Sequence, residues 1–143
     1  TLVRAGAVVR GYELREDFAN RATKNVATFL GEEALARYTV EQRNAYEGID
    51  ETDLDRVVLD LPEPWQVVKH AAKAMHRGGV LVAYTPQITQ AVQLRDELSG
   101  QGFGMVDTLE VLNRGWHIDG QSVRPDHRMV AHTGFLTSAR LLS

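Results

Sequence analysis

Residues 56–90 read RVVLDLPEPWQVVKHAAKAMHRGGVLVAYTPQITQ and predict one strand–helix–strand unit. Residues 57–59 and residues 80–83 are apolar runs without polar alternation, which is typical of parallel strands covered on both faces. An amphipathic helix lies between them, and Gly78–Gly79 is predicted to break the chain before the second strand. Because open parallel sheets bind ligands outside the carboxyl ends of their strands, the residues at those ends are the first candidates for a site.

Two such residues are Asp60, after the first run, and Tyr84, after the second. Asp60 is interpreted as a site carboxylate, with a helix cap or turn carboxylate as the alternative. Pro62 and Pro64 fix φ and remove two backbone donors, so the chain after Asp60 is expected to form a stiff elbow. Trp65 then either packs as a core or lid aromatic at a helix start, or forms the wall of a site for a flat ligand.

The composition is that of one ordinary globular domain: 143 residues, 43% hydrophobic and 24% charged. The sequence contains no membrane-length apolar run and no signal segment, so cytoplasmic residence is the default expectation. Zero cysteines exclude disulfides, thiolate catalysis and cysteine-based metal sites. Asp126, His127 and His132 could supply metal ligands, but their loop spacing does not guarantee convergence, and no metal is expected.

The charge distribution favours the second half of the chain for an anionic partner. Residues 1–55 carry 11 acids and 7 bases, whereas residues 56–143 carry 8 acids, 9 bases and all five histidines. Arg114, Arg124 and Arg128 lie in that half and are candidate phosphate contacts, with solubility or oligomer salt bridges as the alternative. The net charge of −3 lacks the broad basic excess typical of a nucleic-acid binder.

Two further candidates follow strands in the first half of the chain. A strand over residues 7–13 ends at Glu13, where an acid can accept hydrogen bonds from ribose hydroxyls or complement the dipole of the following helix. A strand over residues 38–43 leads to Asn44, which could contact an adenine amino group or turn the chain.

Beyond residue 90, the pattern predicts a helix over 89–98 and strands over 105–112, 117–123 and 132–140. An antiparallel strand pair at the end of a mainly parallel sheet is common in mixed sheets. The fold class is therefore α/β, with a C-terminal antiparallel pair.

One combination of short segments runs through the whole chain: GYELREDF at 11–18, LDLPEPW at 59–65, YTP at 84–86, ITQ at 88–90, RGW at 114–116 and RPDH at 124–127. The combination resembles the class I S-adenosylmethionine-dependent methyltransferases with a Rossmann-like sheet. More narrowly, it resembles the tRNA (adenine-N1)-methyltransferases that modify the T-loop. That resemblance implies methylation of N1 of an adenine, expected at position 58 of tRNA, with S-adenosylmethionine as cofactor.

The resemblance also implies residue roles. Glu13 matches the family's ribose-binding acid, Asp60 its catalytic carboxylate that also lies at the cofactor, and Tyr84 the tyrosine of the target-base pocket. Asn44 stands where the family more often has an aspartate that contacts the cofactor's adenine. Trp65 and the arginines of the tail (Arg114, Arg124, Arg128) are the expected substrate contacts. Family members form homotetramers, so a tetramer is also expected.

One departure from the family pattern concerns its first strand and glycine-rich turn, which this sequence lacks. In that fold the missing strand lies between the strands that end at Glu13 and Asp60. Residues 1–143 are therefore expected to be the C-terminal portion of a methyltransferase catalytic domain, inactive alone, with two unpaired strand edges. The alternatives are a small-molecule methyltransferase and a non-catalytic tRNA-binding or assembly subunit.

Overall fold

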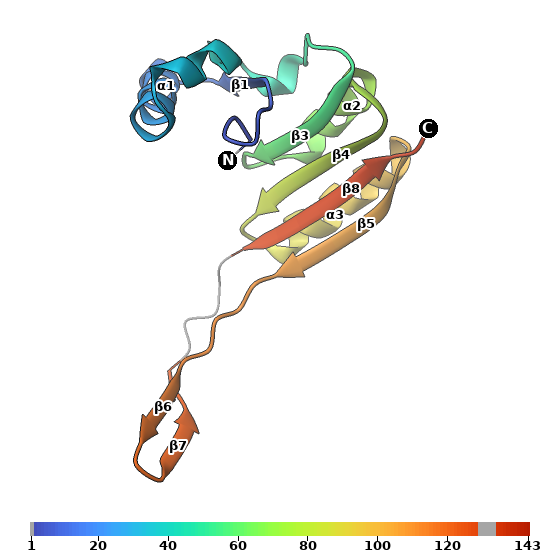
Figure 1. Ribbon diagram of the computed structural model, residues 1–143. Coiled ribbons are helices and arrows are strands. Elements are labelled where there is room, and N and C mark those ends of the chain that lie inside the picture. Colours follow the sequence, from blue (N-terminus) through green and yellow to red (C-terminus); the bar gives the residue numbers. More distant parts are fainter. Residues whose placement is uncertain (1, 129–133) are drawn as a thin grey trace. The chain divides into compact units, whose positions relative to one another are not determined.

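The computed structural model describes residues 2–128 and 134–143 (Figure 1). The chain divides into two compact units, Thr1–Ile49 and Asp50–Ser143, and each is described by itself. Among the described residues, no helix is both long and apolar enough to span a membrane.

Unit 1 is a parallel strand pair with a crossover helix. Its elements are β1 (Val9–Glu13), α1 (Glu16–Leu30), the 3₁₀ helix η1 (Glu32–Arg37), β2 (Tyr38–Gln42) and the 3₁₀ turn η2 (Ala45–Glu47). The two strands pair in register from Val9 with Tyr38 to Glu13 with Gln42. Helix α1 carries Glu16 and Asp17 in its first turn, where acids favour the helix dipole, and ends at Gly31 with φ of 89°.

Unit 2 is a mixed sheet with two helices and a hairpin. Its elements are β3 (Leu54–Asp60), α2 (Trp65–Ala74), β4 (Met75–Thr85), α3 (Ile88–Gly100), β5 (Phe103–Glu110), β6 (Trp116–Asp119), β7 (Ser122–Pro125) and β8 (Phe135–Leu141). The four-stranded sheet has the order β3-β4-β8-β5, with β3 and β4 parallel and β8 antiparallel to both of its neighbours. The expected C-terminal antiparallel pair is confirmed.

Strands β1 and β3 are edge strands, each with one strand partner. Among the described residues, β1 pairs with β2 alone, and β3 pairs with β4 alone. The expected gap between the strands that end at Glu13 and Asp60 stays a prediction.

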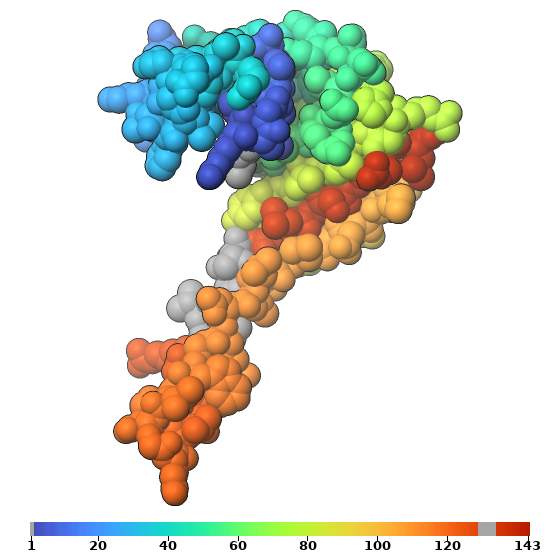
Figure 2. Space-filling view, viewed as in Figure 1, coloured from blue at the N-terminus to red at the C-terminus, as the bar shows by residue number. Residues whose placement is uncertain are grey.

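Within the described residues of unit 2, helices cover one face of the sheet and leave the other open. Helices α2 and α3 both lie behind it in Figure 1, and the residues that alternate toward them are buried, among them Val57, Leu59 and Leu81. Val58 points the other way and is 61% exposed. The expectation of strands covered on both faces is therefore wrong for the described residues. Figure 2 shows the open face, where β4, β8 and β5 form adjacent stripes.

The predicted break at Gly78–Gly79 is also wrong, because both glycines lie inside β4. Leu54 pairs with Met75, and the next pair is Arg56 with Val80, so β4 carries a bulge between these pairs. Gly78 has φ of 88°, and a Cβ on Gly79 would lie 3.0 Å from the His76 carbonyl oxygen and 3.1 Å from that of Leu54. The glycines let the strand bulge where the sequence suggests an end.

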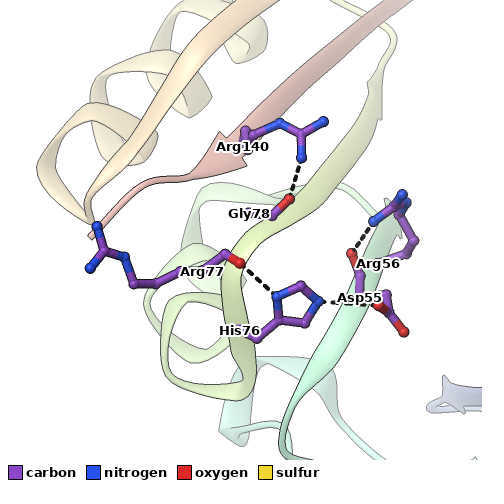
Figure 3. Close-up of polar contacts among 6 residues, drawn as sticks. All are labelled: Asp55, Arg56, His76, Arg77, Gly78 and Arg140. Carbon is purple, nitrogen blue, oxygen red and sulfur yellow. Dashed lines mark hydrogen bonds and ion pairs between the residues drawn. The ribbon is translucent and has the colours of Figure 1, made fainter.

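Polar contacts hold this bulge at the amino ends of β3 and β4 (Figure 3). His76 Nδ1 lies 2.6 Å from the Arg77 carbonyl oxygen, and its Nε2 lies 3.1 Å from Asp55 Oδ1 on β3. On the other side, Arg140 Nη1 of β8 donates to the Gly78 carbonyl. The bulge is thus fastened to both neighbouring strands.

The tail differs from its prediction in one element. The expected strand over 117–123 is the hairpin of β6 and β7, which reverses at Gly120 with φ of 54°. The last strand begins at Phe135, and the predicted strand residues 132–133 lie outside the described residues, as does the candidate metal ligand His132.

Candidate functional site

Asp60 and Tyr84 are register partners at the carboxyl ends of parallel strands β3 and β4. Paired residues of neighbouring strands project from the same face, and both side chains are on the open face of the sheet. Tyr84 pairs onward with Leu136 of β8, which pairs with Leu109 of β5. These three are 37%, 40% and 45% exposed, so a carboxylate and a phenol stand beside an apolar strip at one end of the sheet.

The ring of Tyr84 is placed by Gly134, immediately before β8. Gly134 has φ of 103°, and a Cβ there would overlap the Tyr84 ring, which therefore lies directly against the glycine backbone. Gly134 was not among the predicted site residues, because the contact joins positions far apart in the chain. The signal available was a glycine inside the predicted strand 132–140, where glycine often marks a close approach of another group.

The elbow after Asp60 is fixed as its prolines predict. Pro64 is fully buried and is the N-cap position of α2, so Asp60 does not cap that helix. The first turn of α2 is closed by the backbone N–H groups of Gln66 and Val67, which donate to the Glu63 and Pro64 carbonyls at 3.1 Å. The cap interpretation of Asp60 is thereby excluded for α2.

Trp65, the first residue of α2, is half-buried. A polar side chain of another helix reaches this loop, since Gln90 Nε2 of α3 donates to the Pro62 carbonyl at 3.0 Å. Gln90 carries part of the sequence resemblance, but its position on another helix gave no sign of this contact.

Glu13 lies at the carboxyl end of β1, in unit 1, and is half-buried. Its Oε1 accepts a hydrogen bond of 2.9 Å from the Arg15 backbone N–H, which orients the carboxylate at the start of α1. Asp17 instead pairs with the Arg15 guanidinium, whose hydrogen bonds lower the pKa of Asp17. A carboxylate has lone pairs for several donors, so Glu13 fits an acceptor for ribose hydroxyls.

Asn44 follows β2 at the same edge of unit 1, but its side chain is used locally. Its Oδ1 accepts from the Tyr46 N–H at 3.1 Å, and its Nδ2 donates to Glu47 Oε1 at 3.3 Å. This is the chain-turning role that the sequence analysis kept as the alternative.

The three arginines of the tail are exposed and lie on or beside the hairpin of β6 and β7. The register of this hairpin pairs Trp116 with Pro125 and Ile118 with Val123, which makes one face apolar. The other face carries His117 paired with Arg124, and Asp119 paired with Ser122. Arg114 precedes β6, Arg128 follows β7, and the chain leaves β5 and returns to β8 at the end of the sheet that holds Tyr84.

Comparison with known families gives one match over most of the chain. The family described as tRNA methyltransferase complex GCD14 subunit matches residues 10–123. Among curated proteins, the tRNA (adenine(57)-N(1)/adenine(58)-N(1))-methyltransferase TrmI of Methanocaldococcus jannaschii is 36% identical over 144 residues, covering 98% of this chain and 49% of that protein. TrmI of Thermus thermophilus, named as an adenine(58) enzyme, is 35% identical over 133 residues, covering 93% and 51%.

Among solved structures, one titled as an S-adenosylmethionine-dependent O-methyltransferase from Thermotoga maritima superposes with a TM-score of 0.86 at 30% identity. The match covers 99% of this chain and 54% of that protein. The chain thus spans about half the length of the curated relatives it matches. The Rossmann-like methyltransferase fold expected from the sequence is confirmed.

Proposed function

Because the chain belongs to the tRNA methyltransferase complex GCD14 subunit family, we propose that the whole protein methylates N1 of an adenine in tRNA. S-adenosylmethionine is the proposed methyl donor, and position 58 is the proposed target, as in the name of the Thermus thermophilus relative. The observation that carries the proposal is the pairing of Asp60 with Tyr84 on one open face beside an apolar strip. A carboxylate, a phenol and apolar side chains are the groups that suit a purine.

N1 of adenine has a lone pair, so methyl transfer needs alignment and no covalent enzyme intermediate. When bound, S-adenosylmethionine supplies an electrophilic methyl group. As N1 accepts it, positive charge spreads over the purine and its exocyclic amine. Asp60, accepting a hydrogen bond from that amine, would stabilise the transition state more than the ground state. Tyr84 would contact a base turned out of its loop.

The remaining residues have proposed binding roles. Glu13 would accept hydrogen bonds from the ribose of the cofactor. Asn44 would contact the adenine of the cofactor through the hydrogen-bonding positions of its amide that the turn does not use. Trp65 would line the substrate side, while Arg114, Arg124 and Arg128 would contact phosphates, for which exposed guanidinium groups are suited. We also propose that the protein is cytoplasmic and forms a homotetramer; the exposed apolar face of the hairpin supports association of copies.

Methyl incorporation into an unmodified tRNA transcript, measured with the whole protein, tests this function. A transcript with uridine in place of adenine 58 should accept no methyl group. Asp60→Asn should lower kcat by about 10²- to 10³-fold, the usual cost of losing one transition-state hydrogen bond, and leave tRNA affinity within about twofold. Asp96→Asn, on the exposed side of α3, makes the same charge change and should be neutral. Full activity of Asp60→Asn would remove Asp60 from the mechanism.

A second candidate, methyl transfer to an oxygen of a small molecule, is favoured by the likeness to the Thermotoga maritima structure. The same assay separates the two functions, since a small-molecule enzyme would not methylate either transcript. Salt dependence gives a second criterion, because tRNA binding through phosphate contacts weakens steeply as salt rises.

A further inference from the structure

We propose that Gln90 is a positioning residue that holds the loop carrying Asp60 in register with the strand carrying Tyr84. The two ends of its side-chain amide act on different segments. Oε1 accepts from the Gln87 backbone N–H at 3.0 Å, and Nε2 donates to the Pro62 carbonyl at 3.0 Å. One half-buried side chain therefore joins the connection after β4 to the connection after β3.

The sequence spacing puts both contacts close to the candidate site. Pro62 is two residues after Asp60, and Gln87 is three residues after Tyr84. Asp60 and Tyr84 form the last pair in the β3–β4 register, so among the described pairs none joins the segments that follow these two strands. Gln90 supplies a bridge just past that point.

The contact from Gln90 ties the loop to a different helix. Pro62 and Pro64 have no backbone N–H, which removes two of the donors that a loop of this length would use. The backbone bonds of Gln66 and Val67 to Glu63 and Pro64 close the first turn of α2 itself. The bond from Gln90 comes instead from α3, 28 residues away in the chain.

The amide is needed for chemical reasons that make the proposal testable. At N3 of α3, an acceptor oxygen completes a cap, and glutamate does this as well as glutamine while adding favourable charge at the helix start. Donation to the Pro62 carbonyl, however, needs the NH₂ group, which a carboxylate lacks and would replace with repulsion between two acceptors. Gln90→Glu thus keeps the cap and removes the bridge.

The test compares Gln90→Glu with Gln93→Glu in the whole protein. Gln93 is exposed on the same helix, one turn further on, so it matches the charge change without touching the loop. Melting temperature, hydrogen exchange of the peptide over residues 60–66, and kcat and KM for tRNA methylation are measured for both variants. The kinetic part rests on the proposed function, whereas the exchange part does not.

We expect Gln90→Glu to keep or raise the melting temperature, to speed exchange in residues 60–66 severalfold, and to lower kcat about ten- to a hundredfold with KM within about twofold. Gln93→Glu should change none of these. A purely structural role would lower melting temperature together with activity. Unchanged exchange and kcat in Gln90→Glu would overturn the proposal. If the wild type methylates no tRNA, the proposed function fails, and hydrogen exchange alone decides on the bridge. Unchanged exchange at residues 60–66 in Gln90→Glu would then overturn the bridge, and faster exchange would support it.

Discussion

His76 lies between two acceptors, the Arg77 carbonyl and the Asp55 carboxylate. A carbonyl oxygen can only accept, so Nδ1 must carry a proton toward Arg77, and Asp55 favours a second proton on Nε2. The hydrogen bond to the Arg77 carbonyl, followed by that to Asp55, raises the pKa of His76. When the ring is protonated, it donates on both sides and ties the amino end of β3 to the bulge of β4 (Figure 3).

The hydrogen bonds of His76 make the stability of the folded protein depend on pH in a defined direction. The folded pKa of His76 lies above its unfolded value of about 6.5, so its contribution is complete below that value and disappears as pH rises through the folded pKa. The urea midpoint of the wild type should exceed that of His76→Gln more at about pH 5.5 than at about pH 9. His117→Gln, on the hairpin, is the control. A gap that stays constant or widens with pH would contradict the assignment.

At the same scale, the positions of some candidate residues could be predicted from the sequence and those of others could not. Asp60 and Tyr84 could be predicted because each follows an apolar run, and chain order alone places them at strand ends. Gly134 and the bridging role of Gln90 could not, since they depend on the Tyr84 ring and the Pro62 carbonyl arriving from distant parts of the chain. Asn44 allowed both outcomes, and only its hydrogen bonds show the turn.

Among the elements, the bulge of β4 depends on the absence of a side chain at Gly79. A Cβ on Gly79 would lie 2.8 Å from Met75 Cε and 3.0 Å from the His76 carbonyl oxygen, closer than side chains normally approach. Gly79→Ala should lower the free energy of unfolding by about 1–3 kcal/mol, the usual cost of overpacking. Chemical denaturation of the 143-residue chain measures it.

Gly100→Ala provides the matched comparison, because a Cβ at the end of α3 would meet nothing within 4 Å. It should be neutral or stabilising by up to about 1 kcal/mol, as alanine restricts the unfolded chain. Equal stability of the two variants would show that the bulge tolerates a side chain.

Hydrophobic periodicity predicted most elements but not their surroundings. Apolar runs indicate strands, yet a run such as residues 57–59 reads the same whether one face or both are covered. The glycine pair looked like a boundary because glycine is common at both breaks and bulges. The hairpin turn at Gly120 was missed although the sequence carries a signal for it, Asp119-Gly120 between alternating apolar residues.

For the whole molecule, the open face of the sheet is the feature with the largest expected effect on behaviour in solution. Val58 and Leu136 are apolar side chains on this face, and they are 61% and 40% exposed. Exposed contiguous apolar surface favours association, so we expect the 143-residue chain to associate as its concentration rises.

Replacing both residues with threonine should weaken that association by roughly tenfold or more, given about 1 kcal/mol for each partly exposed side chain. Sedimentation equilibrium measures the effect. Val92→Thr, exposed on α3 on the helical side, should leave association unchanged. Association that is equally strong in the double variant would place the contact elsewhere.

The position of β8 sets the order in which unit 2 can be completed during synthesis. It lies between β4 and β5 but is translated after both, so these strands cannot join one sheet until residue 141 has emerged from the ribosome. Until then β4 and β5 each keep an unsatisfied edge, and Tyr84 has no Gly134 beneath its ring. The nascent chain is therefore most vulnerable to mispairing in the interval between translation of β5 and translation of β8.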